Sequence, residues 1–115
     1  MIALIQKVKS AKVTLNKEVK SEINNGIVIY LGIHIDDSND DINYTIKKIL
    51  KLRIFPKESN KFDISITDLK LQILIIRNHI STGEFGGDMR VESINDGPIN
   101  IIIDSTDKNK SRSNF

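Results

Sequence analysis

The stretch FGGDMRVESINDGPINIIID, residues 85–104, decides the fold, because it holds two strand-like runs around a proline corner. The runs are Met89–Ile94 and Ile99–Ile103, and the corner between them reads Asn95-Asp96-Gly97-Pro98. Proline cannot donate to a sheet ladder, so it belongs at a strand start, on an edge or in a bulge. Glycine before proline removes the side chain that usually restricts such a pair, so Gly97-Pro98 is a rigid corner that can aim two carbonyls at a ligand. An ordinary hairpin turn is the simpler interpretation of these four residues.

Strand patterns continue on the N-terminal side of this stretch. The β-branched run Ile27–Ile35 is too apolar for a strand with one wet face, so we expect a central strand buried on both sides. It follows Asn24-Asn25-Gly26, which is a strong hairpin signal. Short or alternating apolar runs predict the other strands, Ile2–Val8, Val13–Leu15, Glu18–Ile23, Asp63–Thr67 and Leu71–Ile76. Arg77-Asn78-His79 is expected to interrupt the sheet after the last of these.

One helix is predicted, and it opens at Ser38 or Asn39, either of which can cap it. Two aspartates follow and complement the positive end of the helix dipole. Apolar residues at i, i+4, i+7 and i+8 predict the buried face, namely Ile42, Ile46, Ile49 and Leu50. The helix should end near Arg53, before Pro56. One helix among seven or eight strands predicts an antiparallel-rich α+β domain with a barrel-like sheet.

The composition excludes several classes of protein. Seventeen basic and 15 acidic residues leave a net charge of +2, which is too balanced to indicate a nucleic-acid surface by itself. The absence of cysteine removes disulfides and thiolate metal sites. No apolar run approaches the ~20 residues that cross a bilayer, and the N-terminus MIALIQKVK is charged too soon for a secretory signal. We expect one cytoplasmic domain over residues 1–105 and a disordered polar tail at residues 106–115.

Few side chains are arranged for catalysis or metal binding. His34 and His79 have no cysteine near them and match no metal-ligand spacing, so we expect no metal. His34 is expected to be a hydrogen-bonded residue of a buried strand, and His79 a residue of a surface loop. Ser81-Thr82 could hold a nucleophile, but no base is placed to activate it. The glycines around Phe85 do not precede a helix, so they favour a loop that approaches a ligand closely and offers a ring for stacking on an unpaired base.

Several motifs in colinear order resemble the D-aminoacyl-tRNA deacylases. The C-terminal motifs are TGEFGGDM (Thr82–Met89), NDGPI (Asn95–Ile99) and IIIDS (Ile101–Ser105). The motifs closer to the N-terminus are ALIQKV (Ala3–Val8), GIVIYLGI (Gly26–Ile33), KILKLRIF (Lys48–Phe55) and DISITD (Asp63–Asp68). The resemblance covers nearly the whole chain before the tail.

The resemblance implies a homodimeric enzyme that hydrolyses the ester joining a D-amino acid to tRNA, without a cofactor and without a DNA or membrane partner. In that family a Gly–cis-Pro pair of each subunit enters the active site of its partner and rejects L-amino acids by steric clash. The pair maps onto Gly97 and Pro98. Pocket-lining candidates on the same basis are Phe85, Gly86, Met89, Asn95, Asp96 and Lys7. The resemblance also implies that the terminal ribose 2′-hydroxyl of the tRNA assists the reaction.

The chain departs from the family pattern in one long segment and two single positions. Family members follow the strand equivalent to Leu71–Ile76 with a Ser-Gln-x-x-Thr segment, a long loop and a second helix, which this chain lacks. The family's arginine is Lys7, which cannot reproduce a bidentate fork, and its threonine after Gly-Pro-x is Asn100. No catalytic residue is assigned for this reason. Two hypotheses follow: an active D-aminoacyl-tRNA deacylase, or a catalytically inactive dimeric scaffold of the same fold that can bind tRNA ends.

Overall fold

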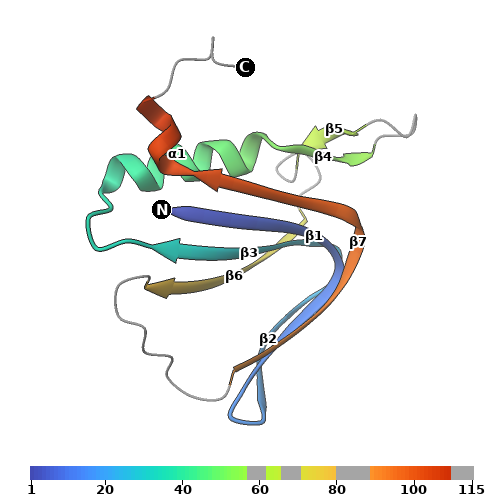
Figure 1. Cartoon of the computed structure of the whole chain (residues 1–115). Helices are drawn as coiled ribbons and strands as arrows, with labels where there is room; N and C mark the ends of the chain where they lie inside the picture. The colour runs from blue at the N-terminus through green and yellow to red at the C-terminus, as the bar shows by residue number, and fades with distance from the viewer. Residues whose placement is uncertain (57–61, 66–70, 80–88, 110–115) are drawn as a thin grey trace.

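Strand β1 (Ile2–Leu15) is the axis of the molecule, because every other strand of the main sheet pairs with it or with its neighbour β3. The computed structural model describes residues 1–56, 62–65, 71–79 and 89–109. The remaining elements are, in chain order, β2 (Glu18–Ile23), β3 (Gly26–Ile33), α1 (Asn39–Lys51), β4 (Arg53–Pro56), β5 (Phe62–Ser65), β6 (Gln72–His79), β7 (Met89–Asp104) and the 3-10 helix η1 (Ser105–Asn109) (Figure 1).

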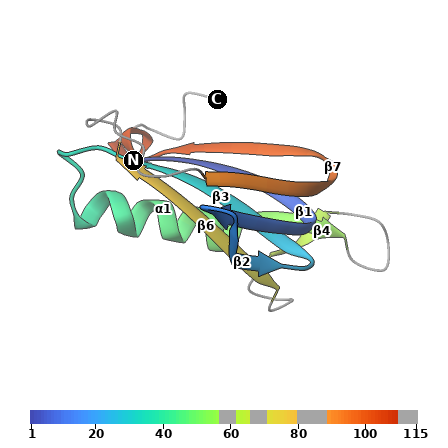
Figure 2. The ribbon, with the colours of Figure 1, turned by 90° about the horizontal axis from the view of Figure 1, so that it is seen from below.

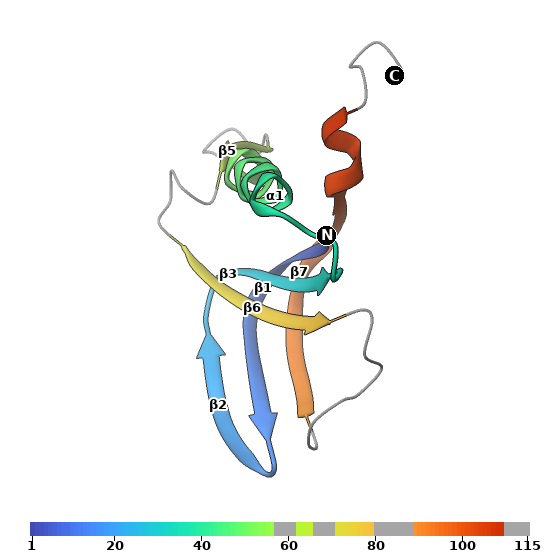
Figure 3. The ribbon, with the colours of Figure 1, turned by 90° about the vertical axis from the view of Figure 1, so that its left-hand side faces the viewer.

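The main sheet is a curled layer with β1 between two sets of partners. On one side β7 runs antiparallel to β1 over its whole length, from the pair Ile2↔Asp104 to the pair Leu15↔Met89. On the other side β3 pairs with the first half of β1 and β2 with the second half, both antiparallel. Strand β6 adds to β3 in parallel. With one long helix on the back of this sheet, the described part of the chain confirms the antiparallel-rich α+β prediction (Figure 3).

Apolar side chains pack on both faces of the sheet. Ile27 and Ile29 belong to the cluster beneath α1, together with Ile49 and Phe55. Val28, between them in the strand, belongs to the cluster on the opposite face. Successive side chains of a strand point to opposite faces, so this alternation confirms that the first half of β3 is buried on both sides. The strand ends at Ile33, and Ile35 lies beyond it with 77% of its surface exposed.

Two strands that the sequence pattern divides are continuous. Ile2–Val8 and Val13–Leu15 belong to one strand, β1, and the two runs on either side of Gly97-Pro98 belong to one strand, β7. The predicted hairpin turn at the proline corner is therefore wrong. The reason is that β1 and β7 are neighbours over their full length and bend together near the middle, so the polar residues at the bend keep a partner strand (Figures 1 and 2).

The hairpin predicted at Asn24-Asn25-Gly26 is also wrong, because these residues connect two strands that do not pair with each other. Strands β2 and β3 both pair with β1 in the same direction, so the chain runs on between them, and no pairing joins β2 to β3 in the described sheet. The hairpin turn is Asn16-Lys17, whose φ angles of 49° and 69° suit the tight turns that match strand twist. Gly26 is needed for another reason, since a Cβ there would lie 1.9 Å from the Gln72 carbonyl oxygen of the neighbouring strand β6.

Helix α1 has the predicted start but a different buried face and a different end. It begins after Ser38, whose backbone N–H donates to Asp41 Oδ2 over 2.9 Å. The residues that face the sheet are Asp41, Thr45 and Ile49. Most of the predicted apolar stripe is exposed, with 41%, 49% and 41% exposure for Ile42, Ile46 and Leu50. The helix is rotated in this way because Asp41 is fully engaged in hydrogen bonds and can therefore be buried. Arg53, the predicted helix end, opens β4 instead.

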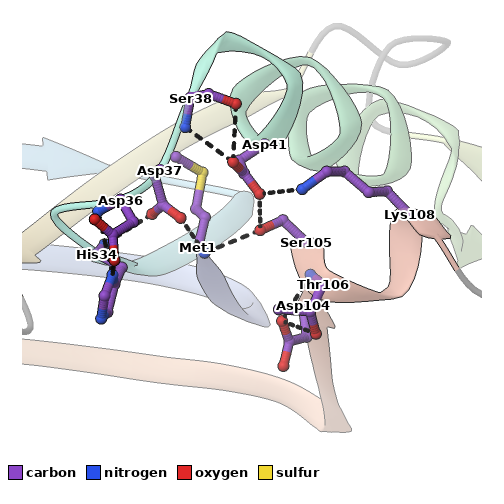
Figure 4. A network of polar contacts seen from close by, with 10 residues as sticks. All are labelled: Met1, His34, Asp36, Asp37, Ser38, Asp41, Asp104, Ser105, Thr106 and Lys108. Carbon is purple, nitrogen blue, oxygen red and sulfur yellow. Dashed lines mark hydrogen bonds and ion pairs between the residues drawn. The ribbon is translucent and has the colours of Figure 1, made fainter.

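Three further boundaries differ from the expectation. Arg77-Asn78-His79 continues β6, because its parallel pairing with β3 extends to Ile33↔His79, so the predicted interruption is wrong and His79 is not a loop residue. Strand β5 covers Phe62–Ser65, while residues 66 and 67 of the predicted strand lie outside the described residues. Residues 106–109 of the predicted tail belong to η1, which contacts α1 through the ion pair of Lys108 with Asp41 (Figure 4). Residues 110–115 lie outside the described part.

Candidate functional site

The candidate site is a bulge in β7 opposite Lys7. The β-ladder pairs Gln6 with Asn100 and Val8 with Asn95, so the four residues between Asn95 and Asn100 face a single residue of β1. Gly97 and Pro98 lie in the middle of these four residues and are exposed. A bulge on an edge strand is one of the places that proline tolerates, since no ladder hydrogen bond is lost there. The proline corner is therefore a projection from the rim of the sheet.

Two polar contacts hold the base of the bulge. Lys7 Nζ lies 3.3 Å from Asp96 Oδ2, and only 8% of the Lys7 side chain is exposed. The same ammonium lies 5.2 Å from the centre of the buried Phe55 ring, at a distance where a cation is attracted to the ring face. On the other side of the bulge Gln6 Nε2 donates to Asn100 Oδ1 over 3.0 Å. The bulge is thus fixed from both strands rather than free to swing.

The tip of the bulge is open. Gly97 has a φ of +79°, a left-handed conformation that L side chains rarely adopt, and a Cβ at this position would meet no atom of the described residues within 4 Å. The space in front of Gly97 can therefore accept a ligand or another subunit. The described peptide bonds include no cis bond, so Gly97–Pro98 is trans in this single chain, unlike the cis bond that the resemblance implies.

The other candidate residues are distributed unevenly around the bulge. Asn95 and Asp96 form its base, and Lys7 lies beneath it. Met89 is half-exposed at the far end of β7, eight residues and roughly 25 Å of strand length from Gly97, so it is not brought to the bulge. Phe85 and Gly86 lie outside the described residues, as does Ser81.

The histidines do not join this site. His34 follows the end of β3 in a loop, where its Nδ1 accepts from the Asp36 backbone N–H over 3.2 Å. Half of its side chain is exposed, so the expectation of a buried strand residue is wrong although the hydrogen bond is present. Of His79 only the backbone position in β6 is described. Within the described ranges, no three histidine or carboxylate side chains are grouped as a metal site requires, and no helix is long and apolar enough to cross a membrane.

Two residues at the bulge were not singled out in the sequence. Phe55 lies in the quoted KILKLRIF motif, but its contact with Lys7 depends on the packing of β4 against the sheet. Gln6 faces Asn100 only because of the β1–β7 register. Spacing along the chain carries no signal for either contact, since the partners are 48 and 94 residues apart.

Comparisons with known proteins agree with this architecture. A family model described as D-Tyr-tRNA(Tyr) deacylase matches residues 4–79, which include most of β1 and the whole of α1 and β6. The class of protein is therefore a deacylase, a hydrolase that removes an acyl group. The chain belongs to the D-Tyr-tRNA(Tyr) deacylase family.

Relatives and a solved structure extend the match to most of the chain. A D-aminoacyl-tRNA deacylase of Finegoldia magna is 36% identical over 145 aligned positions, which cover 91% of this chain and 98% of that protein. A D-aminoacyl-tRNA deacylase of Thermosipho africanus is 31% identical, with 91% and 97% covered. The solved structure of a c-Myc DNA Unwinding Element Binding Protein has a TM-score of 0.79 and 27% identity, and covers 90% of this chain and 98% of its own.

The same alignment measures how much this chain lacks. Ninety-one per cent of 115 residues is about 105 residues, so about 40 of the 145 positions aligned with the Finegoldia magna protein have no residue in this chain. The described part of the chain keeps the two strands, β1 and β7, that build the bulge. The chain is therefore a shortened member of its family rather than an unrelated fold.

Proposed function

We propose that this chain hydrolyses the ester bond of D-aminoacyl-tRNA, releasing free tRNA and a D-amino acid. The observation that carries the proposal is the bulge at Gly97-Pro98, which is fixed at its base and open at its tip. Family membership supports the reaction class, and the relatives carry the corresponding name. The reaction would take place in the cytoplasm, where aminoacyl-tRNA is used.

The bulge would select the stereoisomer by exclusion. Backbone carbonyls and a proline ring present no flexible side chain, so they can clash with the side chain of an L-amino acid whatever its chemistry. A D-amino acid points its side chain in another direction and avoids the clash. Because the tip has open space in its own chain, we infer that it acts in the active site of a second copy, so that the working unit is a homodimer.

Lys7 would act as a residue that positions the bulge. Its ammonium forms an ion pair with Asp96, and this pair connects the bulge to the buried part of β1. A lysine offers one point charge where an arginine offers a planar fork, so the bulge is held by fewer hydrogen bonds than an arginine could make. The ester itself would be attacked by water with assistance from the ribose 2′-hydroxyl of the tRNA, since no described side chain beside the bulge is a nucleophile with a neighbouring base.

A second candidate function is a non-catalytic dimeric scaffold that binds tRNA ends. The observation that favours it is the loss of about 40 aligned positions relative to the Finegoldia magna relative. If those positions supply the wall that orients the ester, the bulge would remain as a binding feature without turnover.

One assay separates the two functions. Purified full-length chain is incubated with D-Tyr-tRNA and, separately, with L-Tyr-tRNA, and the acylated fraction is followed over time, with tRNA binding measured on the same samples. We expect the D-ester to be cleaved at least tenfold faster than the L-ester. Binding of tRNA without cleavage at high protein concentration would favour the scaffold. Equal cleavage of both esters would contradict exclusion by the bulge.

A further inference from the structure

Phe55 lies beneath the candidate site, and its ring faces the Lys7 ammonium. The distance from Lys7 Nζ to the centre of the ring is 5.2 Å, and only 4% of Phe55 is exposed. The face of an aromatic ring carries negative charge density, so a cation above that face is attracted to it. The attraction is stronger where water is excluded. The buried ring is therefore placed to act on Lys7 as well as to fill space in the core.

The ion pair of Lys7 with Asp96 needs support on its inner side. Lys7 Nζ lies 3.3 Å from Asp96 Oδ2, but the Asp96 side chain is 40% exposed, whereas the Lys7 side chain is 8% exposed. Water competes with the ammonium for an exposed carboxylate, so pairs of this kind contribute little by themselves. A lysine stem is flexible and tends to carry its charge toward solvent. An attraction on the buried side of the ammonium opposes this movement and keeps Lys7 beneath the bulge.

The backbone of β4 turns Phe55 toward the core. Ile54 and Phe55 are consecutive in the strand, yet both are buried and belong to the same core cluster. Side chains of a regular strand alternate between its two faces, so two neighbours in one cluster require an irregular backbone. The pairing of β4 with β5 is irregular at this point, with register shifts on both sides of the pair Phe55↔Ile64. Irregularities of this kind re-aim a side chain and are frequent next to active sites.

The ring belongs to the same packed unit as the strand that carries the bulge. Ile103 of β7 is a member of the core cluster that contains Phe55, and Ile99 and Ile101 pack against this cluster. These three residues follow the bulge in the chain. Figures 1 and 2 show β4 near the place where β1 and β7 bend. The ring is thus held by the core on one side and faces the Lys7 ammonium with its surface.

We propose that Phe55 is a positioning residue of the candidate site: its ring holds the Lys7 ammonium at Asp96 and so fixes the bulge whose tip is Gly97. This role rests on the proposed function, because it assigns Phe55 to the selection between stereoisomers. A ring on a fixed strand replaces part of the rigidity that an arginine fork would supply at position 7. Without the negative face of the ring the ammonium leaves Asp96, the tip occupies several positions, and an L-amino acid is excluded less strictly.

Fluorination of the ring tests this role without making a cavity. In the full-length chain Phe55 is replaced by mono-, di- or trifluorinated phenylalanine, which withdraws charge from the ring face and nearly preserves the shape of the ring. We expect kcat/KM for D-Tyr-tRNA to fall with each added fluorine, by about fivefold for the trifluorinated ring, which corresponds to about 1 kcal/mol. The ratio of D-ester to L-ester cleavage should fall in the same order.

Two controls separate the charge of the ring from its packing. In the Lys7→Met background no ammonium faces the ring, so fluorination at position 55 should cause no further loss of kcat/KM. Tyr44 is the matched control on α1, because Lys48 Nζ lies 5.6 Å from the centre of its ring. Fluorinated phenylalanine at position 44, compared with Tyr44→Phe, should leave cleavage unchanged. Equal losses at positions 55 and 44, or equal losses with and without Lys7, would overturn the role of Phe55.

A second measurement does not depend on activity. The NMR order parameter of the Gly97 backbone N–H reports how firmly the tip of the bulge is held, and it should decrease in the chain with the trifluorinated ring. If the wild type cleaves neither ester but the order parameter decreases as expected, the proposed function fails and the positioning of the bulge by Phe55 stands. If the wild type cleaves the D-ester and neither kcat/KM nor the order parameter responds to fluorination, the function stands and the role of Phe55 fails.

Discussion

Gly97 combines a left-handed backbone with open space in front of it. Substitutions at this position can distinguish the effect of backbone strain from the effect of filling that space. Gly97→Ala forces an L side chain into a conformation that costs about 1–2 kcal/mol, so it should lower the free energy of unfolding by about that amount. It should also abolish cleavage of the D-ester, because a methyl group would occupy the open space. Urea unfolding and the D-Tyr-tRNA assay measure the two effects.

Gly97→Asn is the control for strain, because asparagine tolerates the left-handed region better than alanine. It should recover part of the lost stability and still be inactive. Full activity of either variant would contradict the role of this position in selection.

Lys7 lies beneath the bulge and offers a second test at the same scale. Lys7→Met keeps the length of the side chain but removes the cation that faces Asp96 and the Phe55 ring. We expect kcat/KM for D-Tyr-tRNA to fall at least tenfold, about 1.4 kcal/mol of transition-state stabilisation. Lys12→Met is the matched control, since its ion pair with Glu92 joins the same two strands at 3.5 Å but is 41% and 56% exposed. Equal losses in both variants would argue against a positioning role for Lys7.

The ionisation of Asp41 makes the stability of the fold depend on pH. The Lys108 ammonium, the Ser38 backbone N–H and the Ser105 hydroxyl hold the pKa of Asp41 well below its ordinary 3.8. A carboxyl with a lower pKa in the folded state stabilises the fold above its unfolded pKa, and this contribution is lost as the pH falls through the folded pKa. The urea concentration at the unfolding midpoint, measured from pH 7 to pH 2.5, should therefore decrease once the pH is below about 4. The decrease should be less steep in Asp41→Asn and in Lys108→Met. Parallel curves for the three proteins would contradict this account.

At the scale of elements, α1 presents two adjacent rows of side chains with opposite burial. Ile49 is 7% exposed and belongs to the cluster beneath the helix, whereas Ile46 is 49% exposed. Ile49→Ala should cost about 2–4 kcal/mol, because it leaves a cavity, while Ile46→Ala should cost less than about 1 kcal/mol. Denaturant unfolding of the two variants measures the difference. If Ile46→Ala proved the more damaging, the helix would be rotated from the orientation described.

At the scale of the whole molecule, the exposed apolar surface and the open bulge both favour association with a second chain. The exposed aliphatic residues on the helix side of the sheet are Ile42, Ile46, Leu50, Ile73 and Ile75. A small domain has little burial to spare, so exposed apolar surface favours association. We expect light scattering to give the mass of two 13.0 kDa chains at micromolar concentration. A monodisperse monomer would count against the homodimer and against selection across subunits.

Local patterns in the sequence determined the helix and most of the strands, but not β4, which begins at the predicted helix end Arg53. The β-branched run of β3, the capped start of α1 and the apolar tail end of β7 all follow from the properties of nearby residues. The chemistry of glycine and proline singled out the residues of the bulge in advance, and the resemblance supplied their expected role in selection. Met89 lies far from Gly97 along the same strand, and its role as a pocket-lining residue stays a prediction.

Only the tertiary structure decided how these segments use their polar residues. Asn95 to Pro98 would make a hairpin turn in isolation, but β1 supplies hydrogen-bond partners on both sides of them, so they form a bulge in a continuous strand. Asp41 would avoid the core in an isolated helix, but Ser105 and Lys108, more than 60 residues away in the chain, satisfy it and turn the helix. Periodicity records the average environment of a segment, whereas the hydrogen-bond partners of a polar group are set by neighbours distant in sequence, and these become known only when the chain is folded.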